Sequence, residues 1–102
     1  MKRAKCNARL LKVAEDDLSE IASYLATEDP EYSERFLTRI ENNIGYLQGH
    51  PFMGKVPNDK ELAKLGYRYL VVDNYLMFYK IHKRTILIHR VVHGARNYKD
   101  LL

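Results

Sequence analysis

The spacing of apolar residues in the first quarter of the chain is helical. After Val13, the side chains of Leu18, Ile21 and Leu25 recur every three or four residues, which predicts an amphipathic helix. The short apolar stretch at residues 8–12 is typical of an edge strand. No obvious capping residue precedes the helix. Four acids are expected on its water-facing side: Glu15, Asp16, Asp17 and Glu20.

The Asp29-Pro30 pair separates this helix from a second one. Aspartate is a favoured N-cap, and proline is tolerated at the first helical position, where its missing N–H is not needed. Gly49 and Pro51 end the second helix. Its apolar stripe consists of Phe36, Leu37, Ile40, Ile44 and Leu47. Because the connection is so short, we expect an antiparallel helical hairpin with one shared apolar face.

Beyond the hairpin, the period of the pattern changes to two. Residues 50–66 have the composition of a loop, with one helical turn at residues 59–65. Three segments rich in Tyr, Val, Ile and Phe follow as strands, at residues 67–72, 75–82 and 85–93, with turns at Asp73-Asn74 and Lys83-Arg84. The predicted fold class is therefore α+β in the order β-α-α-β-β-β. A two-helix antiparallel hairpin packs on a four-stranded, mostly antiparallel sheet.

Alternation along the strands predicts which side chains share a face of this sheet. In the third strand, Tyr75, Met77, Tyr79 and Ile81 lie opposite Leu76, Phe78 and Lys80. In the last strand, alternation separates Ile86, Ile88, Arg90 and Val92 from Leu87, His89, Val91 and His93. Neither strand has a fully polar face. We therefore expect the face away from the helices to be open, half apolar and dotted with bases, as a docking surface would be.

The net charge of +4 is unevenly distributed. Residues 1–12 hold 5 basic side chains and no acid, whereas residues 13–65 hold 5 basic and 11 acidic ones. Residues 66–102 hold 7 basic side chains against 2 acids. If the two basic ends meet in one sheet, they form a positive layer that attracts a polyanion or an acidic partner. The same charges are equally consistent with a solvated surface.

Length and composition exclude several classes of protein. A chain of 102 residues predicts a single domain, residues 1–102, and 46% hydrophobic residues exclude intrinsic disorder. No apolar run is long enough to cross a membrane, and the amino terminus lacks the apolar region of a signal peptide. Cys6 is the only cysteine, so we expect a cytoplasmic protein without disulfides, metal or cofactor.

The ordered set of segments resembles the RelE/ParE superfamily, the toxins of type II toxin–antitoxin modules. The resemblance covers nearly the whole chain after the first few residues. The segments that carry it are DLSEIASYLA (17–26), FLTRIENNIGYL (36–47), HPFMGKVP (50–57), GYRYLVVDNYLMFYKI (66–81) and ILIHRVVHGARNYKDLL (86–102).

This resemblance implies a growth-inhibiting toxin that is neutralised by a small antitoxin encoded beside it. Superfamily members of the RelE type cut messenger RNA on the ribosome, whereas ParE-type members act on DNA gyrase. The long hairpin, the HPFMG loop and the HGARNY ending resemble the ParE branch more than RelE. That branch usually has aspartate where this chain has Asn97, so any role of that acid is lost.

RelE resembles this chain poorly at its catalytic positions. Its two second-strand lysines fall on Tyr67 and Tyr69, and its third-strand arginine falls on Leu76. Its later arginine is matched by Arg96. The position of its tyrosine falls on Leu102, with Tyr98 as the nearest substitute. Of the five catalytic groups of RelE, this chain thus matches one, at Arg96.

Other nuclease members use histidines and a carboxyl-terminal aromatic, and for those the chain offers a set of candidates. If the protein is a nuclease, we predict His93 as proton acceptor, Arg96 as the cation on the phosphate, and Tyr98 as acid or stacking ring. Each has a structural alternative: His93 ends a strand where it can hydrogen-bond the backbone, and Tyr98 can pack on the helices.

Four further residues are predicted to bind the target or RNA: Arg68, Lys80, His89 and Arg90. For Arg90, however, an ion pair with Asp73 or a helix acid is the favoured interpretation. The antitoxin is expected to wind around the helices and sheet, with its carboxylates against Arg68, Lys80, Arg90 and Arg96. The sequence favours a gyrase inhibitor, with ribosome-dependent messenger cleavage as the alternative. A non-toxic basic nucleic-acid-binding module fits less well, because no helix presents a basic face.

Overall fold

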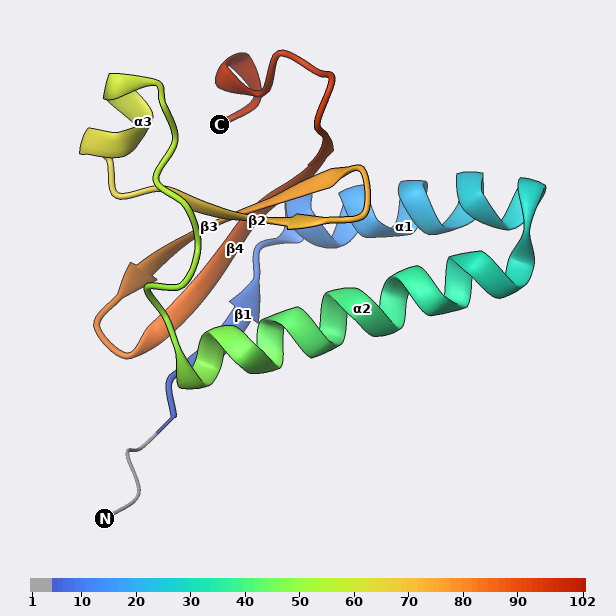
Figure 1. The fold of residues 1–102 in the computed structure, drawn as a ribbon, viewed down its shortest axis with the longest axis horizontal. Coiled ribbons are helices and arrows are strands. Elements are labelled where there is room, and N and C mark those ends of the chain that lie inside the picture. Colours follow the sequence, from blue (N-terminus) through green and yellow to red (C-terminus); the bar gives the residue numbers. More distant parts are fainter. Residues whose placement is uncertain (1–4) are drawn as a thin grey trace.

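The computed structural model describes residues 5–102, so the basic side chains of Lys2 and Arg3 lie outside the described part. The fold has the expected element order, with two long helices before three of the four strands (Figure 1). The elements are β1 (Asn7–Leu10), α1 (Lys12–Glu28), α2 (Pro30–Gly49), α3 (Lys60–Lys64), β2 (Arg68–Val72), β3 (Tyr75–His82), β4 (Thr85–His93) and the 3-10 turn η1 (Tyr98–Leu101). The predicted α+β class is confirmed.

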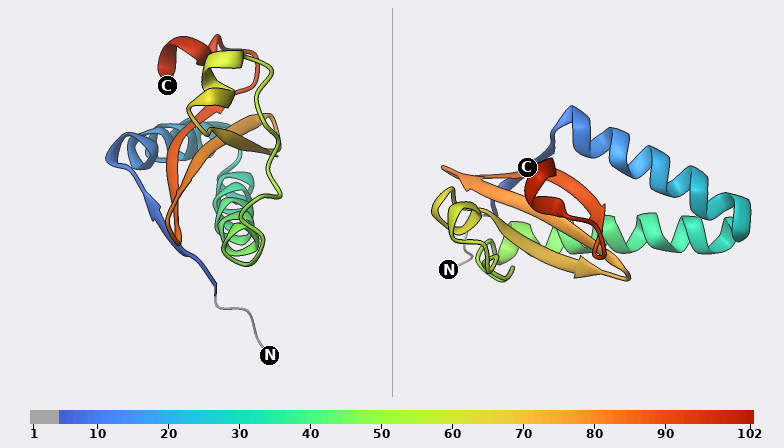
Figure 2. Two further views of the ribbon diagram at one scale, coloured as in Figure 1. Left: turned by 90° about the vertical axis from the view of Figure 1, so that its left-hand side faces the viewer. Right: turned by 90° about the horizontal axis from the view of Figure 1, so that it is seen from above.

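The helical hairpin forms where the sequence predicts it. The Asp29 carboxylate accepts hydrogen bonds from the backbone N–H groups of Glu31 and Tyr32, at 3.1 and 3.2 Å. Pro30 is the first residue of α2, and α1 begins without a side-chain cap, as expected. The Ser33 hydroxyl donates to the Ala22 carbonyl at 2.7 Å and ties the two helices together. The hairpin projects beyond the end of the sheet (Figure 2).

The four strands lie in the order β1-β4-β3-β2. β1 is an edge strand parallel to β4, with Asn7 opposite Thr85 and Leu10 opposite Ile88, whereas the other pairs are antiparallel. The two ends of the chain therefore meet in one sheet, as the charge distribution suggested. Both predicted two-residue turns are present. Each begins with a residue in the left-handed region, Asp73 at φ 55° and Lys83 at φ 56°.

A β-bulge in β4 changes the predicted alternation. Phe78 pairs with Arg90, but the next residue, Tyr79, pairs with Ile88, so His89 is an extra residue. His89 and Arg90 therefore share the face away from the helices, whereas Val91 joins the helix-side core. The predicted placement of the last strand is right through His89 and wrong from Arg90 onward, because the bulge shifts the phase by one.

Each face of the sheet has its own apolar cluster. The helix face packs Met77, Tyr79 and Ile88 against the hairpin. The far face holds a second cluster, in which Phe78 is 0% exposed and Val92 2% exposed, beneath α3 and the C-terminal turn. Figure 1 shows these two segments above the sheet and α2 below it. The expectation of an open, half-apolar far face is therefore wrong, because the chain covers these apolar residues itself.

Candidate functional site

His93 lies at the end of β4, where it serves the backbone. Its Nδ1 accepts a hydrogen bond from the Ala95 N–H at 3.1 Å. Its ring meets Tyr75 edge-on, with centroids 5.4 Å apart, and Tyr75 packs against the helix-side core. His93 thus hydrogen-bonds the backbone at the end of its strand, which was the structural alternative to a catalytic role.

Tyr98 lies on the opposite side of the sheet from the His93 ring. Its ring stacks on Phe78 with centroids 4.9 Å apart, within the far-face cluster. Tyr98 therefore packs on the far face of the sheet and not on the two long helices of the hairpin. Because the two rings contact opposite faces of β3, the structure does not bring His93 and Tyr98 together as an acid–base pair.

Arg96 is exposed at the C-terminal end of the sheet. It lies in the exposed segment between β4 and η1, where its backbone N–H donates to the His93 carbonyl at 3.0 Å. Within residues 5–102, no ion pair or hydrogen bond engages its guanidinium. This cation is free to contact a partner.

Lys80 and His89 come together around Tyr67. The Lys80 ammonium lies 4.4 Å from the centroid of the Tyr67 ring. The Tyr67 hydroxyl lies 3.4 Å from His89 Nδ1, and the two rings meet at 83°. Among the described residues, His89 Nε2 is buried with no hydrogen-bond partner.

The surroundings shift the pKa values of His89 and Tyr67 toward their neutral forms. Burial lowers the pKa of His89, and the nearby Lys80 ammonium lowers it further. Burial also raises the pKa of Tyr67. At neutral pH the group therefore consists of one cation, a neutral imidazole and a neutral phenol. It can hold a phosphate by charge only through Lys80.

Arg90 binds the protein itself. Its Nε and one terminal nitrogen each donate to the Asp17 carboxylate at 2.8 Å, and its other terminal nitrogen donates to the Leu101 carbonyl at 3.0 Å. The alternative prediction, an ion pair with a helix acid, is confirmed. The expectation that Asp17 faces water is wrong, because α1 runs beside the part of β4 that β1 leaves unpaired. The hydrogen bonds that Arg90 donates to Asp17 raise the pKa of Arg90.

Arg68 holds the loop that precedes it. Its guanidinium donates to the carbonyl oxygens of Phe52 and Gly54, at 3.1 and 2.9 Å, and lies 5.2 Å from the centroid of the Phe52 ring. Register places Arg68 opposite Tyr79, on the helix side of the sheet. The four predicted binding residues are thus split between the two faces.

The positions that align with RelE's catalytic lysines and arginine build the far-face cluster. Tyr67, Tyr69 and Leu76 pack there around Phe78. The C-terminal turn adds Leu101 and Leu102 to the same cluster. An ion pair between Lys99 and Asp59, at 3.2 Å, joins this turn to α3. Tyr67, Tyr69 and Leu76 therefore supply apolar contacts where RelE has cationic side chains.

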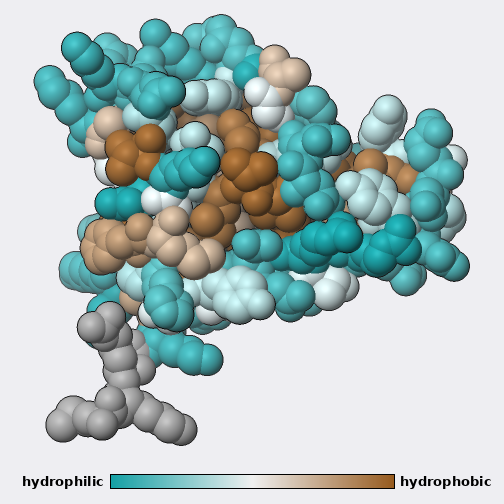
Figure 3. All heavy atoms as spheres, in the orientation of Figure 1, coloured by the Kyte–Doolittle hydropathy of each residue, from teal (hydrophilic) through white to brown (hydrophobic). Residues whose placement is uncertain are grey.

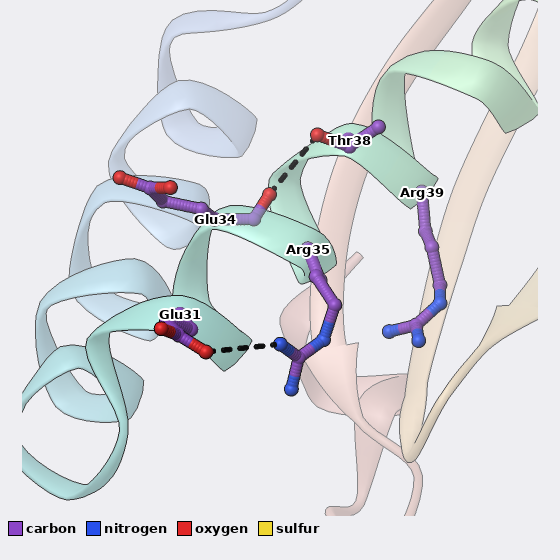
Figure 4. Close-up of a pocket in the computed structure, with 5 residues that line it drawn as sticks. All are labelled: Glu31, Glu34, Arg35, Thr38 and Arg39. Atoms are coloured by element: carbon purple, nitrogen blue, oxygen red, sulfur yellow. Dashed lines mark hydrogen bonds and ion pairs between the residues drawn. The ribbon is translucent and has the colours of Figure 1, made fainter.

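Two hollows lie on the helical layer. The first is open and lies on α2 alone, lined by Glu31, Glu34, Arg35, Thr38 and Arg39 (Figure 4). Arg39 also donates to Asp73 at 3.0 Å, and Tyr32 donates to the same carboxylate at 2.9 Å, so α2 clamps the β2–β3 turn. The second hollow lies between the helices and β1, and is lined by Leu10, Glu15, Leu18, Ser19, Ala22, Ser23 and Leu37.

The Pro51–Val56 loop holds none of the predicted site residues, yet it exposes two large apolar side chains. Phe52 and Met53 are exposed there, at 67% and 43%. Two adjacent large apolar residues between Pro51 and Gly54 were the available signal. Within residues 5–102, no group of three potential metal ligands is present, and no helix is long and apolar enough to span a membrane.

The chain matches a known protein family over residues 8–98: the ParE toxin of the type II toxin–antitoxin system, parDE. It therefore belongs to this family of the RelE/ParE superfamily and is a toxin of a type II toxin–antitoxin system. No curated protein matches the chain.

Solved structures from both branches share the fold. The chromosomal ParDE system from P. aeruginosa matches with a TM-score of 0.72 at 17% identity, over 89% of this chain and 98% of that one. The RelBE2 toxin–antitoxin complex from Mycobacterium tuberculosis matches with a TM-score of 0.64 at 25% identity, over 93% and 98%. Because structures from both branches match, the shared fold does not distinguish a gyrase target from a ribosomal one.

Proposed function

We propose that this toxin arrests growth in the cytoplasm by inhibiting DNA gyrase through surface contacts, and that a cognate antitoxin encoded beside it blocks this action. The proposal extends the ParE family membership of residues 8–98 to a target. Inhibition by binding requires a stable surface and no proton transfer. It therefore does not depend on the candidate acid and base being close together.

The observation that carries the proposal is the separation of the candidate catalytic groups. Cleavage by a ribose 2′-hydroxyl needs a base, an acid and cations gathered around one phosphate. Here the His93 and Tyr98 rings contact opposite faces of the sheet, and Arg90 is already bound to Asp17. Within residues 5–102, Arg96 is the candidate cation at this end of the sheet whose guanidinium no other group engages.

The second candidate function is ribosome-dependent cleavage of messenger RNA. Two observations favour it: Arg96 is unpaired and aligns with a catalytic arginine of RelE, and Lys80 lies beside the neutral His89. In this mechanism, Arg96 would stabilise the phosphorane charge, Lys80 would bind the RNA further along the sheet, and a metal ion would not be required. The separation of His93 from Tyr98 makes this the weaker proposal.

The antitoxin would bind both layers of the protein. The hollow between α1, α2 and β1 has an apolar floor of Leu10, Leu18 and Leu37, suited to apolar side chains of a segment that orders on binding. Carboxylates of the antitoxin would pair with Lys80 and Arg96. Arg68 and Arg90 are less available, because their guanidinium groups already bind the chain.

Induction of the toxin in growing cells separates the two candidates. We would map the 5′ ends of messages on ribosomes within minutes of induction and follow the response to DNA damage in the same cultures. The proposal predicts a DNA-damage response with intact messages. New message ends at ribosomal A-site codons without DNA damage would contradict it and support the second candidate.

A further inference from the structure

The loop after α2 is held in one conformation by a buried tyrosine. The Tyr79 side chain is 0% exposed, and its hydroxyl donates to the Pro51 carbonyl at 2.8 Å and accepts from the Gly54 N–H at 3.0 Å. A Cβ on Gly54 would lie under 3.0 Å from three side-chain atoms of Tyr79, namely its hydroxyl oxygen and two ring carbons. Only glycine allows this close approach, so the loop is fastened directly to the core.

Further hydrogen bonds fix the same loop from the sheet. The Arg68 guanidinium binds the carbonyl oxygens of Phe52 and Gly54. Lys55 forms both backbone hydrogen bonds of an antiparallel bridge with Tyr69, at 2.8 and 2.9 Å. The loop is therefore preorganised, which lowers the entropy lost when a partner binds it.

The fixed loop leaves apolar side chains in water. Phe52, Met53 and Val56 are 67%, 43% and 50% exposed, and together we call them the loop platform. Val71 on β2 is also 56% exposed. Figure 3 shows apolar atoms gathered over β2 and over the loop that leads to it. A preformed apolar surface of this kind is typical of a protein contact.

The charge around the loop platform indicates the chemistry of its partner. Lys55 is exposed within the loop, and residues 50–72 hold 4 basic side chains against 2 acids. One of those acids, Asp59, is already paired with Lys99. A second copy of this chain would bring the same positive charge against it. An acidic segment with apolar side chains is complementary to this region.

We propose that the loop platform is a docking site for the antitoxin, which would place apolar side chains on Phe52, Met53 and Val56 and carboxylates near Lys55. The inference rests on the proposed function in one respect, that this toxin has an antitoxin. Three side chains cover far less than a complete interface, so the platform adds an anchor to a longer contact.

The test measures binding of the purified product of the small reading frame that adjoins this gene. Phe52→Ser and Val56→Ser variants are compared with the unaltered chain by calorimetry, after circular dichroism has shown an unchanged fold. Leu65→Ser is the matched control, because Leu65 is 59% exposed just after α3 and lies outside both the loop and the hollow of the hairpin. We expect each loop variant to lose at least about 10-fold in affinity, and Lys55→Glu to weaken binding as well, while the control binds normally.

Four outcomes would overturn the inference. Folded loop variants that bind with unaltered affinity would exclude the loop platform, and an equal loss of affinity in Leu65→Ser would show that the effect is not specific to the loop. Loss of growth arrest with full antitoxin affinity would assign the loop to the toxin's target. Loss of self-association in the loop variants, again with full affinity, would assign it to a second copy. By contrast, no binding to the unaltered chain would contradict the proposed function itself.

Discussion

Asp17 on α1 and Arg90 on β4 form a two-point ion pair, and the same carboxylate accepts a hydrogen bond from the Val91 N–H at 2.9 Å. The side chains are only 12% and 18% exposed. Asp17 thereby accepts hydrogen bonds from a backbone N–H of the bulged strand and from the arginine beside the bulge. The contact fixes α1 against β4 at the position where β1 ends.

Asp17→Ala is expected to destabilise the fold by about 2–4 kcal/mol, slightly less than for a fully buried pair, because Arg90 and the Val91 N–H both lose their acceptor. Urea unfolding measures the change. Asp16→Ala is the control, since Asp16 bonds Lys12 at an exposed site. The control should leave the midpoint unchanged. Equal urea midpoints for both variants would show that the Asp17–Arg90 ion pair contributes no more to stability than an exposed pair.

Stability should depend on pH through His89. Its pKa in the folded chain is lowered by burial and by Lys80, whereas the unfolded chain binds a proton near pH 6.5. Between these two values the unfolded state holds more protons, so stability falls as the pH drops below about 6.5. We expect His89→Gln to flatten this part of the profile, measured as the unfolding free energy from pH 5 to 7.5. An unchanged slope would show that His89 does not contribute to it.

Gly54→Ala should loosen the loop. The new methyl group would overlap the Tyr79 ring, and overpacking of this kind costs about 1–3 kcal/mol. Gly45→Ala is the matched control, because nothing lies within 4 Å of a Cβ there and the residue is inside α2. That variant should be more stable by roughly 0.5–1 kcal/mol. Amide exchange at residues 52–55 should rise in the Gly54 variant alone.

Arg96→Ala should relieve growth arrest without changing the unfolding midpoint. Arg96 is exposed, and its guanidinium binds nothing within residues 5–102, so the fold does not depend on it. Arg35→Ala removes another exposed positive charge, on α2, and should leave the toxin active. Colony counts after induction measure both variants. Full toxicity of the Arg96 variant would remove this residue from the functional surface.

Local rules predicted most of the fold. Asp29-Pro30 marks the start of α2 because capping depends on a few adjacent residues, and the two short turns fix the antiparallel register of the last three strands. The parallel pairing of β1 with β4 depends on contacts between the two ends of the chain. No local pattern specifies that pairing.

The site was harder to predict, because two features depend on tertiary context. One extra residue at His89 produces the bulge, and alternating apolar residues continue through it without a break. The role of Tyr98 depends on how the last residues fold back over Phe78. The sequence indicated which polar groups the chain carries, but not that they lie on different faces.

The central claim is that the protein acts by binding gyrase and not by cutting RNA. The most direct test is the supercoiling of relaxed plasmid by purified gyrase, with increasing amounts of the purified toxin. Our account predicts that supercoiling falls as toxin is added, and that prior mixing with the antitoxin restores it. Full supercoiling in an excess of toxin that still arrests growth in cells would contradict the account.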